Sequence, residues 1–413
     1  MRSITGGVTA AKGFRAASCA AGIKYRDRTD MAMLFCDVKC AVAGTFTSNR
    51  VKAAPVLWDM DVVYHEKTAQ AVVVNAGIAN AATGEEGLRL CGETAAFTGK
   101  ALGIPARAVL LGSTGVIGPQ IPLDKITAGV AAMKDALSPT EEAGTAASRA
   151  IMTTDTVNKE CAVEFDLPSA DGGGNVTVRL GGMCKGSGMI HPNMCTMLAY
   201  LTTDCAIDQA LMQRALRDTV ADTFNMITVD GDTSTNDTLL LMADGLAGNA
   251  PITAEGQAYG AFRDALFAVC RQLAIAMAGD GEGATHLLEM RVTHADTEEH
   301  AKALAKSVVG SSLVKAMVYG RDANCGRILC ALGYAGVDFD PAGIEVFLEG
   351  DNERVVFYTG GRVQAFDEEK ALALLSEKAV RFSCDMHMGG AEATAWGCDL
   401  TYDYVKINGD YRS

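Results

Sequence analysis

Residues 185–204 read Lys185-Gly-Ser-Gly-Met-Ile-His-Pro-Asn-Met-Cys-Thr-Met-Leu-Ala-Tyr-Leu-Thr-Thr-Asp204. A glycine-rich loop with one cation, Lys185, leads into an apolar, strand-like segment, and Thr196 lies at the junction. The Thr196 hydroxyl is able to attack the carbonyl of Cys195 and turn the peptide into an ester that water cuts. The new chain would begin at Thr196, whose α-amino group, with a reference pKa of about 7.7–8.0, can serve as base for its own hydroxyl. The same residues also fit an ordinary threonine that enters a strand or caps a turn.

Length and composition are those of a folded protein with a large core. The 413 residues suggest two or three domains. Hydrophobic residues make up 49% of the chain and charged residues 21%, which argues against disorder. The formal net charge is -14, with acidic residues spread along the chain, which argues against nucleic acid or an anionic membrane as a partner. Small anionic substrates remain compatible, because they need only local positive charge.

The cysteines and the N-terminal stretch bear on the compartment. The chain has 13 cysteines, with no Cys-x-x-Cys pair and no zinc spacing, and this predicts reduced core residues in a reducing compartment. No apolar run is long enough to span a membrane, and Met1-Arg-Ser-Ile-Thr-Gly-Gly has no apolar signal region. We therefore expect a soluble, cytoplasmic protein.

Hydrophobic periodicity predicts strands and helices mixed along the whole chain. The predicted strands are 31–36, 71–75, 109–112, 161–166, 175–180, 287–293 and 399–407. The predicted helices are 86–102, 123–137, 141–152, 208–220, 258–278, 296–309 and 368–379. This mixture, without strict βαβ regularity, predicts an α/β or α+β protein with sheets covered by helices.

Nucleotide and metal motifs are weak in this sequence. Gly279-Asp-Gly-Glu-Gly follows a predicted helix, whereas a dinucleotide-binding loop follows a strand. The stretch Asp230-Gly-Asp-Thr-Ser-Thr-Asn-Asp237 starts like a calcium loop, but its sixth position is Thr235 and its twelfth is Leu241. With no His-Glu-x-x-His motif either, we predict no metal and no cofactor.

Three polar stretches remain as candidates for acyl chemistry. Ser113-Thr-Gly115 is expected to end a strand in a tight turn, where backbone N–H groups and a hydroxyl could stabilise an oxyanion, or where the chain merely turns. Glu282, between two glycines, is either a solvated loop carboxylate or a partner for a cationic substrate group. Thr153-Thr-Asp-Thr156 either terminates a helix or offers hydroxyls to a ligand.

A set of motifs in one order resembles a known family. They are Gly6-Gly-Val-Thr, Lys12-Gly-Phe-Arg-Ala, Thr47-Ser-Asn-Arg-Val-Lys-Ala-Ala-Pro55, Ser113-Thr-Gly-Val-Ile-Gly118, Met152-Thr-Thr-Asp-Thr156, Lys185-Gly-Ser-Gly-Met-Ile, Asn193-Met-Cys-Thr-Met-Leu, Asp230–Asp237, Asp280-Gly-Glu-Gly-Ala-Thr285, Ser312-Leu-Val-Lys315, Ala393-Thr-Ala-Trp396 and Cys398-Asp-Leu-Thr-Tyr-Asp-Tyr-Val-Lys-Ile-Asn408. Together they resemble the ornithine acetyltransferase (glutamate N-acetyltransferase, ArgJ) family of arginine biosynthesis, over essentially the whole chain.

The resemblance implies a two-domain fold of helix-covered sheets, an ArgJ/DmpA-like sandwich, and self-cleavage between Cys195 and Thr196. The chains would then be 1–195 and 196–413, with Thr196 as the nucleophile of the second. It also implies an oxyanion hole at Thr114 and Gly115. The implied substrate contacts are Thr153 or Thr154, Lys185, Thr196, Glu282, Asn408 and Ser413.

The implied activity moves the acetyl group of N-acetylornithine to glutamate through an acetyl-threonine intermediate. Whether acetyl-CoA also serves as a donor stays open. The two cleaved chains are expected to stay associated as a heterotetramer with two copies of each. Two rivals remain: a self-cleaving aminopeptidase or amidase with the same threonine nucleophile, and an uncleaved amino-acid-binding protein without catalysis.

The sequence departs from the family pattern at a few places. Cys195 and His191 stand where the family usually has alanine, and Ile78 where asparagine is expected. Cys325 replaces an aromatic residue, and Ser413 replaces threonine. Cysteine at the scissile carbonyl is expected to affect the cleavage rate, whereas Ser413 keeps a hydroxyl. None of these changes removes a catalytic group.

Overall fold

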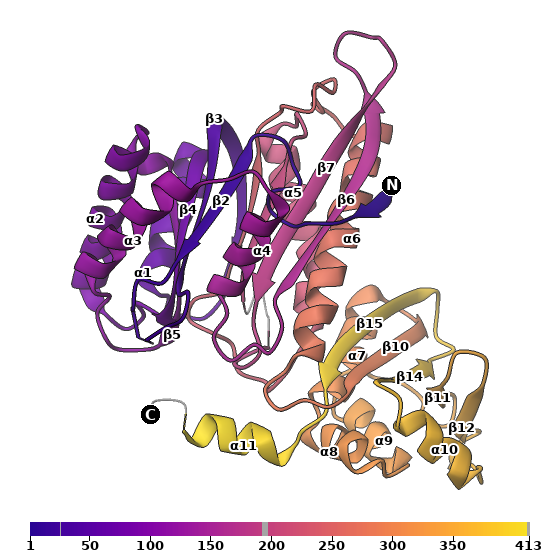
Figure 1. Cartoon of the computed structure of the whole chain (residues 1–413). Coiled ribbons are helices and arrows are strands. Elements are labelled where there is room, and N and C mark those ends of the chain that lie inside the picture. The colour runs from indigo at the N-terminus through magenta and orange to yellow at the C-terminus, as the bar shows by residue number, and fades with distance from the viewer. Residues whose placement is uncertain (25, 192–196, 411–413) are drawn as a thin grey trace. The chain divides into compact units, whose positions relative to one another are not determined.

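The computed structural model describes residues 1–24, 26–191 and 197–410 and divides the chain into two compact units. Unit 1 contains Met1–Gly186, Pro192–Asn225 and Thr233–Ala274. Unit 2 contains Ser187–His191, Met226–Asp232 and Ile275–Ser413. Each unit has its own sheet (Figure 1).

Unit 1 is built on a nine-stranded sheet with the order β1-β6-β7-β8-β9-β3-β4-β5, in which β2 also pairs with β3. Most neighbours are antiparallel, but β4 with β5 and β8 with β9 are parallel. The strands are β1 Arg2–Ile4, β2 Phe14–Cys19, β3 Met31–Phe46, β4 Thr68–Ile78, β5 Val109–Val116, β6 Lys159–Pro168, β7 Asn175–Lys185, β8 Leu198–Thr203 and β9 Thr238–Ala243.

Helices and hydrophobic side chains cover both faces of this sheet. On β4, Ala71 and Val73 join one core cluster, whereas Val72 and Val74 join another on the opposite face. Burial on both faces explains why this strand reads as a continuous apolar run instead of an alternating one. The helices are α1 Ala54–Asp61, the π-helix η1 Val62–Glu66, α2 Gly84–Leu102, the 3₁₀ turn η2 Ala106–Ala108, α3 Leu123–Ala136, α4 Glu141–Ala150 and α5 Gln209–Asp222.

Within unit 1, α1 and α2 contact β5, whereas α3 contacts α2, β2 and β3 (Figure 1). Two further elements run from unit 1 into unit 2: the 3₁₀ turn η3 Phe224–Met226 and the long helix α6 Gln257–Gly279.

Unit 2 is built on a six-stranded sheet with the order β13-β12-β11-β14-β10-β15. The helix α7 packs on β10 and β15, and Ala301, Leu304 and Val308 on α7 are fully buried. The elements are β10 Leu287–Ala295, α7 Glu298–Gly310, α8 Ser312–Gly320, α9 Cys325–Gly333, β11 Glu345–Glu349, β12 Arg354–Thr359, β13 Arg362–Val363, α10 Glu368–Leu375, β14 Ala379–Asp385, β15 Ala391–Cys398 and α11 Tyr402–Gly409.

The predicted mixture of helices and helix-covered sheets is confirmed, but three local predictions are wrong. The segment 399–407 was expected to be a strand, and it forms α11 instead. The helix predicted over 368–379 ends at Leu375, and β14 begins at Ala379. The strand expected to stop at Gly112 continues to Val116, because it pairs with the far end of β4.

Two other predictions concern membrane-spanning helices in the described residues and the position of the self-cleavage. Among them, no helix is long and apolar enough to cross a membrane. The predicted division into 1–195 and 196–413 is a covalent cut at residues outside the described part, and it stays a prediction.

The described cysteines are nearly all inaccessible to solvent. Ten are buried, Cys19 is half-buried, and Cys330 on α9 is exposed. Burial in an apolar surrounding disfavours the thiolate, and it raises the pKa of Cys161 to about 12. The buried cysteines that the structure describes are therefore free thiols with low intrinsic reactivity, as expected from the sequence, whereas Cys330 is exposed.

Candidate functional site

The end of β5 is shaped by a close contact with β4. Gly115 lies opposite Gly77 in the parallel pairing, and the register shifts directly after this pair. Gly115 has a φ of +127°, and a Cβ atom there would lie 2.2 Å from the carbonyl carbon of Gly77. Only glycine satisfies both conditions, so the backbone N–H groups of this segment have a defined place. Thr114 and Gly115 thus lie among the last residues of β5 rather than in the tight turn that we expected after the strand.

Side-chain amides hold the peptide before Thr114. Asn236 Nδ2 donates to the carbonyl oxygens of Ser113, at 2.8 Å, and of Ala79, at 2.6 Å. The Ser113 hydroxyl donates to Asn75 Oδ1 at 2.7 Å. These buried hydrogen bonds fix the strand end that carries Thr114, because breaking one would leave a buried polar group unpaired.

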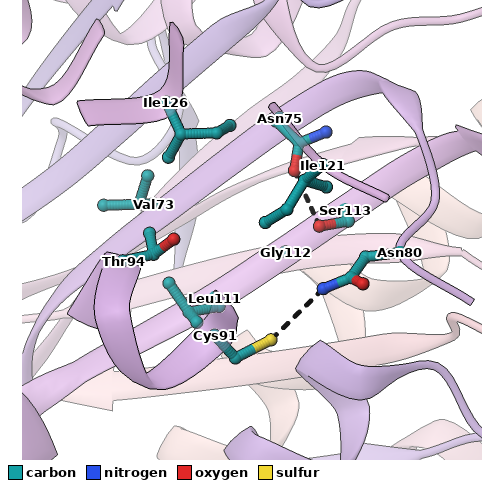
Figure 2. A pocket seen from close by; sticks show the side chains of 10 residues that line it. All are labelled: Val73, Asn75, Asn80, Cys91, Thr94, Leu111, Gly112, Ser113, Ile121 and Ile126. Atoms are coloured by element: carbon teal, nitrogen blue, oxygen red, sulfur yellow. Dashed lines mark hydrogen bonds between the residues drawn. The ribbon is translucent and has the colours of Figure 1, made fainter. Parts of the chain in front are cut away.

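Figure 2 shows the small hollow behind this strand end, lined by residues of β4, β5, α2 and α3. The Asn75–Ser113 hydrogen bond borders it, and Asn80 Nδ2 contacts Cys91 Sγ at 3.4 Å (Figure 2). Its volume is only about 10 Å³, which is room for about one water molecule. The pocket is therefore too small for an amino-acid substrate and belongs to the packing around β5.

Lys185 ends β7 and reaches the Thr114 hydroxyl. Its Nζ donates to Thr114 Oγ1 at 3.3 Å, and both residues are buried. An ammonium has only donors, so this bond occupies a lone pair of the threonine oxygen. The hydroxyl proton of Thr114 is therefore directed elsewhere, and the adjacent positive charge makes it a better donor to a developing anion.

The Thr153–Thr154 pair follows the end of α4 and is half-buried. Arg28 donates to the Thr153 carbonyl oxygen at 3.2 Å and also to that of Met152. Asp155 Oδ2 accepts the Thr153 backbone N–H at 3.1 Å. The backbone of this pair is thus held by its neighbours on both sides.

Buried charges surround Lys185 in unit 1. Burial opposes the charge of Asp155, but Lys185, Lys159 and two hydrogen-bond donors outweigh it and lower the pKa of Asp155 to about 2. Asp237 behaves oppositely: burial raises its pKa well above the ordinary value, although hydrogen bonds from Ser234 and Thr47 act against this. Asp155 is thus firmly ionised and paired with Lys159, whereas the Lys185 ammonium lies next to the Thr114 hydroxyl and favours an anion there.

Unit 2 presents the other predicted residues, beginning with Glu282. Its backbone N–H donates to the Ser187 carbonyl oxygen at 2.9 Å, and the residue is buried. A Cβ on Gly188 would lie 2.3 Å from the Glu282 carboxyl carbon, so the carboxylate packs directly on the glycine. Glu282 is therefore a fixed, buried carboxylate, and the solvated alternative is wrong.

The helix α11 brings Asn408 to Glu282. Asn408 Nδ2 donates to Glu282 Oε2 at 2.7 Å and to the Tyr404 carbonyl oxygen at 3.0 Å. The Tyr404 hydroxyl donates to Asp230 Oδ2 at 3.3 Å, and burial followed by the Asp230 charge raises the pKa of Tyr404. In contrast to unit 1, this group is rich in carboxylates and suits a cationic ligand.

The structure brings the predicted residues together in two groups. In unit 1, Lys185 contacts Thr114, and Gly115 follows Thr114 in the chain. Asp155 links Thr153 to Gly186, the residue after Lys185. Unit 2 holds Glu282 and Asn408 in direct contact. Cys195, Thr196 and Ser413 lie outside the described residues.

The sites that depart from the family pattern have ordinary surroundings. His191 Nδ1 contacts the Thr228 hydroxyl at 3.0 Å, and burial lowers the pKa of His191. Ile78 is the last residue of β4, and Cys325 is the first residue of α9. In the described parts of the chain, no three His, Cys, Asp or Glu side chains are arranged to hold a metal ion.

Sequence reasoning missed the residues that support these groups. Asp155 and Asn236 were part of quoted motifs, but neither was given a role. Asn75, Arg28 and Lys159 were not singled out. The signal that could have identified Asp155 is its position between hydroxyl residues, because an aspartate there readily accepts from a nearby backbone N–H.

Comparison with known proteins identifies relatives over the full chain. A family model described as the ArgJ family matches residues 15–413. The arginine biosynthesis bifunctional protein ArgJ of Symbiobacterium thermophilum is 51% identical, with 100% of each chain covered. The protein of the same name from Caldanaerobacter subterraneus subsp. tengcongensis is 44% identical, also with 100% of each chain covered.

Solved structures of related proteins match about half of the chain. ArgJ from Bacillus halodurans is 45% identical with a TM-score of 0.49, and the match covers 51% of this chain and 97% of that chain. Ornithine acetyltransferase from Mycobacterium tuberculosis, complexed with ornithine, is 40% identical with a TM-score of 0.42, covering 47% and 98%. The family model and the full-length relatives decide the assignment: the chain belongs to the ArgJ family of arginine-biosynthesis enzymes, as its motifs predicted.

Proposed function

We propose that this enzyme transfers the acetyl group of N-acetylornithine to glutamate through an acetyl ester on Thr196. The observation that carries the proposal is the Lys185–Thr114 contact at the end of β5, next to Gly115, where the backbone geometry accepts only glycine. A buried cation, a hydroxyl donor and a backbone N–H held by the strand pairing lie in one place and suit a developing oxyanion. The names of the relatives, arginine biosynthesis bifunctional protein, agree with this activity.

The first step of the proposal is self-cleavage. The Thr196 hydroxyl attacks the Cys195 carbonyl, the peptide C–N bond breaks to leave an ester and a free α-amino group, and water then hydrolyses the ester. The products are chains of residues 1–195 and 196–413. The free amino group, with a reference pKa near neutrality, then acts as base for the Thr196 hydroxyl.

The sheet of unit 1 supports the expectation that the two pieces stay together. The strand β7 precedes the cut and β8 follows it, and the two pair antiparallel from Leu180↔Thr203 to Lys185↔Leu198. The strand β9 likewise pairs with β3. Both pieces would thus share one hydrogen-bonded sheet after cleavage. A heterotetramer with two copies of each piece is our proposal for the assembly, tested by the mass of the native protein.

In the transfer, the Thr196 hydroxyl attacks the acetyl carbonyl of N-acetylornithine, and its proton passes to the α-amino group. Thr114 and the Gly115 N–H stabilise the tetrahedral oxyanion, and ornithine leaves with the proton on its amine. The amine of glutamate then attacks the ester and regenerates the Thr196 hydroxyl. The two halves of the reaction use the same donors, because each passes through a similar oxyanion.

Charge supports the assignment of the substrate groups. We assign the substrate carboxylate to Lys185 and the hydroxyls of Thr153 or Thr154, because Lys185 brings a buried ammonium next to Thr114. We assign the substrate ammonium to Glu282, which is buried and ionisable, and we assign Asn408 and Ser413 as further contacts. The cytoplasmic location stays a prediction.

The test combines intact mass with an exchange assay. Mass spectrometry should find pieces of 195 and 218 residues, whereas Thr196→Ala should give one chain of 413 residues without activity. Wild-type enzyme given N-acetylornithine and glutamate should form N-acetylglutamate much faster than free acetate. Release of acetate alone would support the amidase, and an uncut, inactive wild type would support a binding protein. Repeating the assay with acetyl-CoA as the only donor tests the second donor that "bifunctional" suggests.

A further inference from the structure

Asp155 joins the two segments of unit 1 that carry predicted substrate contacts. Its Oδ2 accepts the Thr153 N–H at 3.1 Å, and its Oδ1 accepts the Gly186 N–H at 2.7 Å. Gly186 directly follows Lys185. One carboxylate therefore ties the Thr153–Thr154 loop to the end of β7, although the two segments are 31 residues apart along the chain.

This carboxylate has no exposure to solvent and no freedom to take another place. Its side chain is 0% exposed, and Oδ1 also accepts from Lys159 Nζ at 2.7 Å. Lys159 donates in addition to the Val157 carbonyl oxygen at 3.2 Å. A buried carboxylate with two backbone donors and one ammonium is close to fully satisfied, so it fixes the backbones that donate to it.

The geometry links this carboxylate to the reacting atoms through Lys185. The Gly186 N–H bond holds the peptide that follows Lys185, and the Lys185 ammonium donates to Thr114 Oγ1 at 3.3 Å. A shift of this peptide moves the Lys185 ammonium with it. Since a misplacement of about 1 Å can cost roughly 10²-fold in rate, the bond to Gly186 is expected to matter for turnover.

We propose that Asp155 is a positioning residue of the transferase, which orients the Thr153–Thr154 loop and the Lys185 ammonium by accepting the backbone N–H groups of Thr153 and Gly186. The expected kinetic effect of this inference rests on the proposed function, whereas the hydrogen bonds that hold the two backbone segments do not depend on it. The competing view is that Asp155 merely neutralises Lys159 in the core.

Three variants separate positioning from charge neutralisation. Asp155→Asn keeps the shape but removes the charge, and its amide can accept only one of the two N–H groups. Lys159→Met removes the ammonium and leaves both N–H bonds of Asp155 in place. The double variant removes both buried charges. Asp171→Asn is the matched control, because Asp171 also accepts a backbone N–H, from Gly173 at 2.8 Å, but is exposed.

The kinetic expectation distinguishes the two views. Asp155→Asn should lower kcat/KM by roughly 10²-fold, and Lys159→Met and Asp171→Asn should stay within about 3-fold of wild type. The double variant should regain most of the melting temperature that Asp155→Asn loses, because no unpaired charge is left, but it should not regain kcat/KM. Recovery of both in the double variant, or an equal kinetic loss in Lys159→Met, would overturn the proposal.

Hydrogen–deuterium exchange tests the geometry without any activity. Peptides that contain Thr153 and Gly186 should exchange faster in Asp155→Asn and in the double variant. In Lys159→Met, their exchange rates should equal those of the wild type. Equal protection in all proteins would overturn the positioning role, even for an inactive enzyme. An active wild type with an unaffected Asp155→Asn counts against Asp155 alone, whereas a wild type without acetyl transfer counts against the proposed function.

Discussion

Replacing Gly115 by alanine should damage catalysis far more than a surface glycine substitution does. The new Cβ would lie 2.2 Å from the Gly77 carbonyl carbon and 2.4 Å from its oxygen, and ordinary contact begins at 3.4 Å. These are backbone atoms, so no side chain can yield. Either β4 or β5 must move by about 1 Å, and φ +127° adds strain of its own.

The displacement predicts the size of the effect. The N–H of residue 115 and the hydroxyl of Thr114 move together, and a lost or displaced oxyanion donor typically costs about 10²–10³ in kcat. The free energy of unfolding should fall by about 2–4 kcal/mol, because parallel pairing at the end of β4 is disturbed as well. The effect on KM should be smaller, since the oxyanion forms only in the transition state.

Gly118→Ala is the matched control for this experiment. Gly118 also has a positive φ, +109°, but a Cβ there meets no atom within 4 Å. It should therefore lose only about 1–3 kcal/mol of stability from backbone strain and keep its kcat. Steady-state acetyl transfer and thermal melting of both variants give the answer. If Gly115→Ala turned over like Gly118→Ala, the strand end would not hold an oxyanion donor.

Three further predictions follow from buried and ionised side chains. Asn408→Ala should raise the KM for the amino-acid substrates several-fold with little change in melting temperature, because Asn408 is exposed yet donates to Glu282 at 2.7 Å. Steady-state kinetics test this, and an unchanged KM would show that Asn408 does not contact the substrate. Asp59→Asn should stabilise the protein at neutral pH by about 1–3 kcal/mol, because Asp59 Oδ2 is buried without a hydrogen bond and burial raises the pKa of Asp59, whereas the asparagine oxygen can still accept from the Leu111 N–H. The gain in unfolding free energy should shrink as pH falls toward the ordinary aspartate pKa. Denaturant titrations that show no gain at pH 7 would contradict this prediction. The lowered pKa of Asp155 contributes stability above its ordinary pKa of 3.8 that is lost as pH falls to about 2. The difference in unfolding free energy between wild type and Asp155→Asn should therefore narrow by about 2 kcal/mol over that range. A constant difference would show that folding does not lower the pKa of Asp155.

The sequence predicted the strongly periodic or strongly apolar elements well. The strand β4 and the helices α2, α3 and α6 match their predictions within a few residues, because long apolar patterns leave little choice of structure. The short helices α1, α8 and α9 were not predicted. Each is only eight or nine residues long, and such helices form mainly because tertiary packing buries one face.

The helix α11 shows why local pattern fails at the candidate site. Tyr402-Asp-Tyr-Val-Lys-Ile contains four aromatic or β-branched residues among six, which is typical of a strand. In the structure no residue of α11 is buried, and its side chains reach Glu282 and Asp230 instead. Contacts with residues more than 100 positions away decide this conformation, and no local pattern contains them.

The predicted catalytic and binding residues came from a family resemblance, and the supporting residues came only from the structure. Hydroxyl, lysine and carboxylate side chains can be recognised by chemical type in a sequence. The hydrogen bonds of Asn236 to Ser113 and of Asp155 to Gly186 depend on strand register and loop closure. Register over a nine-stranded sheet with a bulge at its end is not readable from one sequence.

Thiol labelling of the buried cysteines can report on local unfolding of each unit. A maleimide added to the folded protein meets Cys330 on α9, the exposed sulfur among the described cysteines. Buried sulfurs of unit 1, such as Cys161 and Cys184, can react only when β6 or β7 opens, and Cys384 and Cys398 report on β14 and β15 of unit 2. The order in which the peptides that contain these four cysteines gain the mass of the label therefore ranks the opening rates of the two units, without any engineered cysteine.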